Sequence, residues 1–256
     1  MIARGGRGLP ALVLLLLLAL LGGAARSVEA QTGCTNPALC GLPVASTTNQ
    51  ADLAVAIDVV LVGDGFIDMT DWHAVAAGAI AGFQGAGSNM YGRVPGLYNF
   101  HVVDVVSAGT DVSNTDVADT ALGMRVSGPF ITVDQGRANL AALNAPDVDV
   151  VVAIANSGGG RANANYPSQL ASGGTVRLSR NTGVLTHELG HALFHLADEY
   201  EETALCSSPT EGLMLREPNV TTDATCHKFA GIPGAACVQG GRYCSTGTYR
   251  SAATCF

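Results

Sequence analysis

Continuous apolar runs in the first two thirds of the chain predict buried β-strands. Three such runs, rich in β-branched residues, cover residues 55–62, 100–106 and 149–155. The first run ends in Gly63-Asp64-Gly65, and the third ends in a glycine-rich loop that starts at Asn156, as expected of strands that run into turns. Because both faces of these strands are apolar, we expect them in the interior of a sheet.

Helical spacing of apolar residues appears between these runs, so strands and helices alternate. The predicted helices cover residues 69–84, 116–125 and 135–143. Further along, residues 175–178 predict a short strand, and Asn181 or Thr182 is a suitable N-cap for a helix that begins near Gly183. This alternation predicts an α/β (α+β) domain built on a mixed sheet.

The N-terminal segment has the pattern of a secretory signal peptide. Arg4 and Arg7 precede a long apolar run, and a cleavage site follows at Ala30. The alternative is an uncleaved membrane anchor, but the run is shorter than the ~20 residues that span a bilayer. We therefore expect a secreted protein, extracellular or periplasmic, with no stable membrane insertion after cleavage. The predicted organisation is a signal peptide at residues 1–30, an irregular leader at 31–50 and one domain at 51–256.

Cysteine usage agrees with export, since all seven cysteines follow the predicted cleavage site. They are Cys34, Cys40, Cys206, Cys226, Cys237, Cys244 and Cys255. No C-x-x-C pair is present, so a zinc ribbon or a thioredoxin-type site has little support. Residues 201–256 are rich in loops and hold five of the seven, which predicts a disulfide-stapled C-terminal lobe. The odd number leads us to expect a domain truncated at its C-terminus, with the partner of Cys255 missing.

The charge of the chain argues against one class of partner. The formal net charge is -8, with a single lysine and twelve arginines, and these form no basic stripe. A protein that follows a phosphate backbone needs such a stripe, so we expect no nucleic acid partner.

The stretch HELGHALFHLADEY carries the strongest chemical signal. On a helix, His187 and His191 lie about 40° apart around the axis and roughly 6 Å along it, so both can bind one ion. Glu188 projects about 100° from His187, within reach of a water on that ion. The opposite face is apolar and consists of Leu185, Leu189, Ala192, Leu193 and Leu196. About 0.004 such motifs are expected by chance in a chain of this composition, so two unrelated surface histidines are a poor explanation.

These residue types suit hydrolysis by zinc. Two neutral imidazoles hold Zn²⁺ and leave room for a water, whose pKa falls to about 7 on the metal. Glu188 would take the proton of that water as a general base and then deliver it to the departing amine.

The third ligand is less directly encoded. In an unbroken helix, His195 lies about 12 Å along the axis from His187, too far to share one ion. If the helix breaks near Phe194 and His195, the chain turns back and brings Asp198 or Glu199 to the metal. We favour Asp198 over Glu199. A purely structural role for both carboxylates, such as capping or pairing with Arg216 or Arg242, is the remaining alternative.

These residues resemble the bacterial IgA-peptidase-like family of zinc metallopeptidases, whose hallmark joins His-Glu-x-Gly-His to Leu-Ala-Asp-Glu-Tyr. Weaker similarities lie at residues 61–66, 99–102, Ser107, Asn156, 218–220, 249–250 and Cys255. The resemblance implies a metzincin-like zincin fold, with a twisted sheet over the zinc helix and an irregular lobe that closes the cleft. It also implies zinc ligands at His187, His191 and Asp198 and a base at Glu188. Many relatives have glycine or another small residue where this chain has Phe194-His195.

Three functions remain open from the sequence. The leading hypothesis is a zinc metalloendopeptidase that acts on extracellular proteins or peptides. The second keeps the zinc chemistry but makes the enzyme an amidase of cell-wall peptides, because the metal activates any such carbonyl. The third is a non-catalytic binding module stabilised by a metal. Glu188 argues against the third, since a structural zinc site has four protein ligands and needs no base.

Overall fold

The structure is a computed structural model, and its elements follow the alternation of strands and helices that the sequence predicts. The residues that the structure describes are 36–46, 55–85, 94–110, 112, 120–165, 174–207, 210, 216–232 and 235–251. The predicted signal peptide lies outside them. None of the helices in the described ranges is long and apolar enough to cross a membrane.

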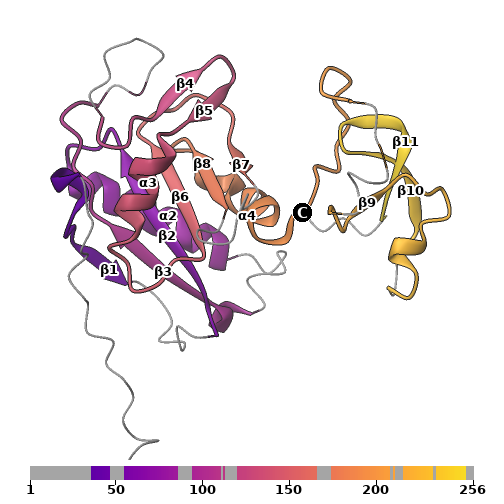
Figure 1. Ribbon diagram of the computed structural model, residues 1–256, viewed down its shortest axis with the longest axis horizontal. Coiled ribbons are helices and arrows are strands. Elements are labelled where there is room, and N and C mark those ends of the chain that lie inside the picture. The colour runs from indigo at the N-terminus through magenta and orange to yellow at the C-terminus, as the bar shows by residue number, and fades with distance from the viewer. Residues whose placement is uncertain are drawn as a thin grey trace, which may run out of the picture. The chain divides into compact units, whose positions relative to one another are not determined.

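A six-stranded mixed sheet forms the centre of the domain (Figure 1). Its strands in spatial order are β1 (Val44–Ser46), β3 (Tyr98–Val103), β2 (Ile57–Asp64), β6 (Val150–Ala155), β8 (Thr175–Leu178) and β7 (Asn163–Asn165). The four inner strands are parallel, whereas β1 and β7 are antiparallel to their neighbours. Every residue of β3 and β6 is buried, as the apolar runs predict for strands covered on both faces.

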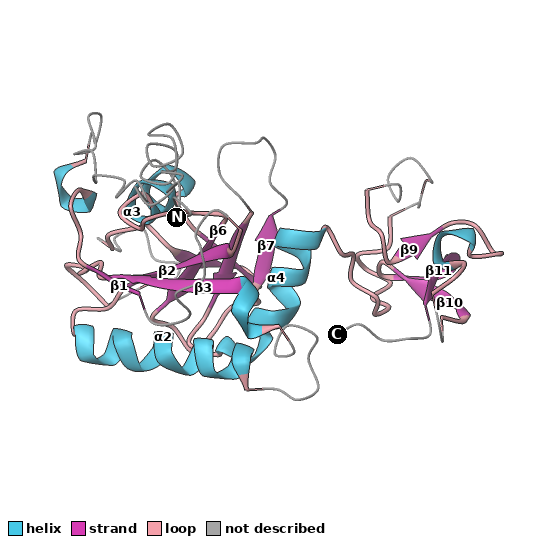
Figure 2. Cartoon of the chain, turned by 90° about the horizontal axis from the view of Figure 1, so that it is seen from below, coloured by secondary structure: helices cyan, strands magenta, loops and turns pink. Residues whose placement is uncertain are grey.

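Three helices cover the two faces of this sheet. Helices α2 (Met69–Gln84) and α4 (Leu185–Phe194) lie on one face, and α3 (Gln135–Ala142) lies on the other (Figure 2). Val59 and Leu61 of β2 pack in the core beside α2 and α4. Val60 and Val62 alternate with them and pack beside α3. Because β2 contributes to both cores, it ties the two layers together.

Short polar side chains begin the helices, as the sequence rules predict. Asp68 caps α2 by accepting a hydrogen bond from the amide of Thr70 at 2.8 Å. Asp134 caps α3 through the amide of Arg137 at 3.1 Å. Ahead of α4, the side chain of Asn181 accepts from the amide of Gly183 at 3.4 Å and begins a 3-10 turn, η4 (Thr182–Val184).

The C-terminal residues form a small disulfide-linked lobe, as predicted. It contains a three-stranded antiparallel sheet of β9 (Val220–Thr221), β10 (Cys237–Gly241) and β11 (Cys244–Ser251). Disulfides join Cys206 to Cys244 and Cys226 to Cys237. The remaining elements of the described residues are a hairpin of β4 (Arg125–Ser127) and β5 (Phe130–Thr132), and the 3-10 turns η1 (Pro37–Leu39), η3 (Pro95–Leu97) and η5 (His227–Phe229).

The mixed α/β fold is confirmed, with two differences in detail. The predicted helix at 116–125 is wrong over its described part, because residues 120–124 contain a turn and Arg125 begins β4. Residues 44–46, placed in the irregular leader from the sequence, form β1 and pair with β3. Three residues are too short for an apolar alternation to be visible, so the sequence could not show this strand.

Candidate metal centre

Helix α4 presents one face to the core and the other to a cleft. Leu185, Leu189 and Ala192 are buried in the core beneath the sheet, as the apolar pattern predicts. His187 and His191 share the opposite face, with their ring centroids 4.5 Å apart. Because its apolar face is packed in the core, the helix holds the two imidazoles in fixed positions beside one another.

The helix ends where the sequence allowed a break. Phe194 is its last residue, and His195 follows in the left-handed conformation with φ 56°. The amide of Leu196 then donates to the carbonyl of Gly190 at 3.2 Å, so the chain turns back instead of continuing along the axis. Leu196 therefore lies beyond the helix and is not part of its apolar face. The next few residues run back toward the histidines.

This reversal brings Asp198 to the two histidines. Its Oδ1 lies 2.9 Å from Nε2 of His187 and 3.3 Å from Nε2 of His191, and the two nitrogens are 3.0 Å apart. Ligands of a tetrahedral zinc ion at about 2.0–2.1 Å lie about 3.3 Å from one another, so the three atoms fit such an ion. Among the residues described, these three form the one group of at least three His, Cys, Asp or Glu side chains with metal-binding spacing.

Glu199 points elsewhere. Its carboxylate accepts a hydrogen bond from Nδ2 of Asn219 at 3.2 Å, and burial raises its pKa. The predicted alternative of a pairing with Arg242 does not hold for Asp198, because Nε of Arg242 bonds to Glu217 at 2.7 Å. The structure therefore places the carboxylate of Asp198, and not that of Glu199, against the two histidines.

The hydrogen bond at one ring nitrogen of His191 directs the other ring nitrogen toward Asp198 and His187. Its Nδ1 contacts the carbonyl oxygen of Leu196, which accepts and cannot donate, so this nitrogen carries the proton. In the neutral ring, Nε2 is then the unprotonated nitrogen, and it faces Asp198 and His187. Fixing a ligand histidine through its other nitrogen is a usual feature of metal sites.

The electrostatics of the group favour positive charge beside Asp198. Burial opposes the charge of Asp198, but hydrogen bonds from His187, His191 and Tyr243 hold its pKa well below the usual range. Burial alone would lower the pKa of His191, yet the hydrogen bond to Asp198 raises it above the ordinary value. Asp198 is thus a carboxylate at neutral pH, although only 9% of its surface is exposed.

Glu188 lies in the same cleft and is largely desolvated. Burial raises the pKa of its carboxyl above the ordinary value, while the charges of His191 and His187 act in the opposite direction. The cleft has a volume of about 400 Å³. Its lining includes Glu188, the side chains of His187, His191 and Asp198, and Asn163 and Ala164 of β7.

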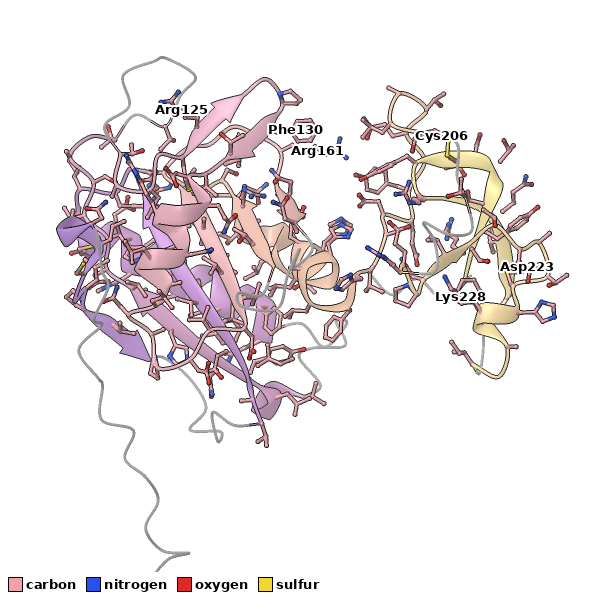
Figure 3. All side chains as sticks on the ribbon, in the orientation of Figure 1. Arg125, Phe130, Arg161, Cys206, Asp223 and Lys228 are labelled. Atoms are coloured by element: carbon pink, nitrogen blue, oxygen red, sulfur yellow. A yellow bond between two sulfur atoms is a disulfide. The ribbon has the colours of Figure 1, made fainter. Side chains whose placement is uncertain are left out.

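Two residues of the cleft were missed from the sequence. Tyr243 donates its hydroxyl hydrogen to Oδ2 of Asp198. The pKa of Tyr243 lies above the ordinary value, mainly because the hydroxyl is buried and also because of this hydrogen bond. Arg161 pairs with Glu202 at 3.0 Å and also contacts the hydroxyl of Tyr200. Figure 3 shows Arg161 beside Phe130, and a backbone bridge joins these two residues. No local pattern marks either residue, because each meets its partners only through the tertiary fold.

Comparison with known proteins identifies the family of the chain. The sequence model of one family, IgA Peptidase M64, matches residues 45–255. A search of curated proteins gave no match. The matched region covers most of the chain and contains α4, the C-terminal lobe and the sheet except for Val44. The chain therefore belongs to the IgA Peptidase M64 family of peptidases.

Proposed function

We propose that this protein is a secreted zinc-dependent endopeptidase with Glu188 as its general base. The observation that carries the proposal is the convergence of His187, His191 and Asp198 within 3.3 Å of one another, with Glu188 in the same cleft. These three side chains would hold the ion. A zinc ion with three protein ligands supplies a coordination position for water and lowers the pKa of that water to about 7.

The environment of Glu188 suits a group that takes up a proton and releases it. Its carboxyl is 6% exposed, and burial raises its pKa, so it keeps a proton more readily than a carboxylate in water. Glu188 would accept a proton from the attacking water and donate it to the amine that leaves. A purely structural metal site would have no use for such a residue.

An extended peptide fits the edge of the sheet beside this group. Among the described residues, β7 has a strand partner, β8, on one side only. Asn163 and Ala164 of β7 line the cleft together with His187 and Glu188. An open edge offers backbone N–H and C=O groups to an extended chain, so a polypeptide can pair with β7 and pass beside the histidines, as an endopeptidase requires.

Secretion is proposed from two independent features. The N-terminal sequence has the signal-peptide pattern, and the disulfides Cys206–Cys244 and Cys226–Cys237 form readily only in oxidising compartments. Protein or peptide substrates outside the cytoplasm are the corresponding partners.

The test uses purified protein with casein and with peptide libraries. Chelation should abolish hydrolysis and added zinc should restore it. Glu188→Gln should lower kcat by about 10²–10⁴-fold with unchanged zinc content, since only the proton transfer is lost. Glu201→Gln, a change at an exposed glutamate, is the matched control. Full activity of Glu188→Gln would disprove the proposed role of this residue.

A parallel assay separates the rival substrate. Peptidoglycan fragments are incubated with the same preparations, and the products are identified by mass spectrometry. Release of cell-wall peptides without cleavage of any protein substrate would favour the amidase over the endopeptidase.

A further inference from the structure

The turn between β10 and β11 has a backbone that its residues do not favour. Arg242 and Tyr243 connect the paired residues Gly241 and Cys244, and both have positive φ, 51° and 67°. Two-residue hairpin turns of this kind normally contain Asn, Asp or Gly, because a Cβ is strained in the left-handed region. Neither arginine nor tyrosine suits this conformation, so their side chains must serve another purpose at this position.

Both side chains have specific partners. Nε of Arg242 bonds to Glu217 at 2.7 Å. The hydroxyl of Tyr243 donates to Oδ2 of Asp198, and its ring packs edge-on against Tyr200 with centroids 5.4 Å apart. The turn therefore delivers the tyrosine hydroxyl to one oxygen of Asp198.

The other oxygen of Asp198 belongs to the proposed metal centre. Oδ1 is the atom that lies 2.9 Å from His187 and 3.3 Å from His191. The two oxygens thus have separate tasks, since Oδ1 faces the imidazoles and Oδ2 accepts from Tyr243.

The backbone holds this arrangement in register. The amide of Arg242 donates to the carbonyl of Asp198 at 2.6 Å, and the amide of Tyr243 donates to that of Tyr200 at 3.0 Å. In return, the amide of Glu202 donates to the carbonyl of Tyr243 at 2.9 Å. The turn and the segment that carries Asp198 are therefore hydrogen-bonded as one unit.

We propose that Tyr243 is a positioning residue that keeps Asp198 a one-oxygen ligand of the metal. A carboxylate whose second oxygen is free can bind a cation through both oxygens and occupy a further coordination position. Because Oδ2 accepts the hydrogen bond from Tyr243, it does not bind the metal. One coordination position on the metal therefore stays available for water, as catalytic zinc sites require. This inference rests on the proposed metal site and adds a residue that controls how the site is coordinated.

The test is Tyr243→Phe, which keeps the ring against Tyr200 and removes only the hydroxyl. Zinc affinity is measured by competition with a chromophoric chelator, and coordination is followed by the visible absorption of the Co²⁺-loaded protein. We expect zinc binding to weaken by about 10–100-fold, as for other partners of metal ligands. The Co²⁺ absorption should also weaken, because an ion with more ligands absorbs less strongly than a tetrahedral one.

Two further variants complete the design. Tyr249→Phe removes a hydroxyl from β11 in the same lobe and should match the parent in affinity and spectrum. Tyr243→Asn tolerates the left-handed backbone but is too short to reach Asp198, so it should reproduce the loss even if Tyr243→Phe folds poorly.

The outcomes separate this inference from the proposed function. If the parent protein binds neither Zn²⁺ nor Co²⁺, the metal centre itself is wrong. If the parent binds both and Tyr243→Phe has the same affinity and spectrum, the metal centre stands and the role of Tyr243 is wrong.

Discussion

Oδ1 of Asp198 lies 2.9 Å from Nε2 of His187, although the end of α4 and a reversal of the chain separate the two residues. The neighbouring Glu199 turns to Asn219 instead. Asp198→Ala should therefore lower zinc affinity strongly. The loss should exceed the factor of about 10–100 that is typical when a residue hydrogen-bonded to a metal ligand is removed. Glu199→Ala should retain the zinc. Metal content after dialysis, together with chelator competition, measures both, and a loss of zinc in Glu199→Ala alone would reverse the assignment.

The left-handed residue after α4 predicts a stabilising substitution. His195 has φ 56°, which glycine adopts without strain. His195→Gly should stabilise the protein by about 0.5–1 kcal/mol and raise the melting temperature by a few degrees, as measured by thermal unfolding monitored by circular dichroism. The control is Phe194→Gly at the last helical residue, where φ is not left-handed, and this change should destabilise the protein by up to about 1 kcal/mol. A lower melting temperature for His195→Gly would contradict the prediction.

The two disulfides should differ in their effect on the metal centre. Cys206–Cys244 closes 38 residues and Cys226–Cys237 closes 11, so loop entropy predicts losses of about 4 and about 3 kcal/mol when each pair is changed to serine. Only the loss of Cys206–Cys244 should also weaken zinc binding, because Cys244 directly follows Tyr243. Urea unfolding and chelator competition test the two effects, and equal zinc affinities in the two double variants would contradict the link.

An ion pair between α2 and the loop after β8 predicts a pH dependence of stability. Arg180 bonds to both carboxylate oxygens of Asp71, at 2.6 and 2.7 Å, and this hydrogen bonding lowers the pKa of Asp71. The stabilisation is complete above the unfolded pKa of about 3.9 and is lost as the pH falls through the lower folded value. Since both side chains are 39% exposed, its size should not exceed about 1 kcal/mol.

Asp71→Asn tests this prediction in metal-free protein. Its free energy of unfolding should fall below that of the parent at pH 7 and approach it below pH 3, as measured in urea. One molar salt should reduce the difference at pH 7, because the pair is exposed to solvent. A difference that does not change with pH would mean that Asp71 acts through something other than its charge.

Much of the fold was predictable because it rests on local patterns. The apolar run at 55–62 anticipates β2, and the spacing at 69–84 matches α2. The polar strand β7, Asn-Ala-Asn, has no such pattern, since its place follows from pairing with β8 and from contact with α4. Tertiary context, and not local propensity, determines elements of this kind.

The candidate site divides in the same way. His187, Glu188 and His191 share one helix, so helix geometry brings them together in any fold that contains it. Asp198 requires a left-handed residue at His195, which histidine adopts less readily than glycine. Tyr243 comes from another lobe and enters through a strained turn. The sequence therefore predicts the three helix residues directly. It narrows the third metal ligand to Asp198 or Glu199, and it gives no sign of Tyr243.

The position of β2 at the middle of the sheet also has a kinetic consequence. Val60 pairs with His101 on one side and Val151 on the other, so neither pairing can begin as a local hairpin. Parallel strands that pair over such distances fold slowly. Until the helices have packed, the apolar run of β2 can associate with other chains. The yield of refolded protein should therefore depend on how dilute the chains are while the sheet assembles.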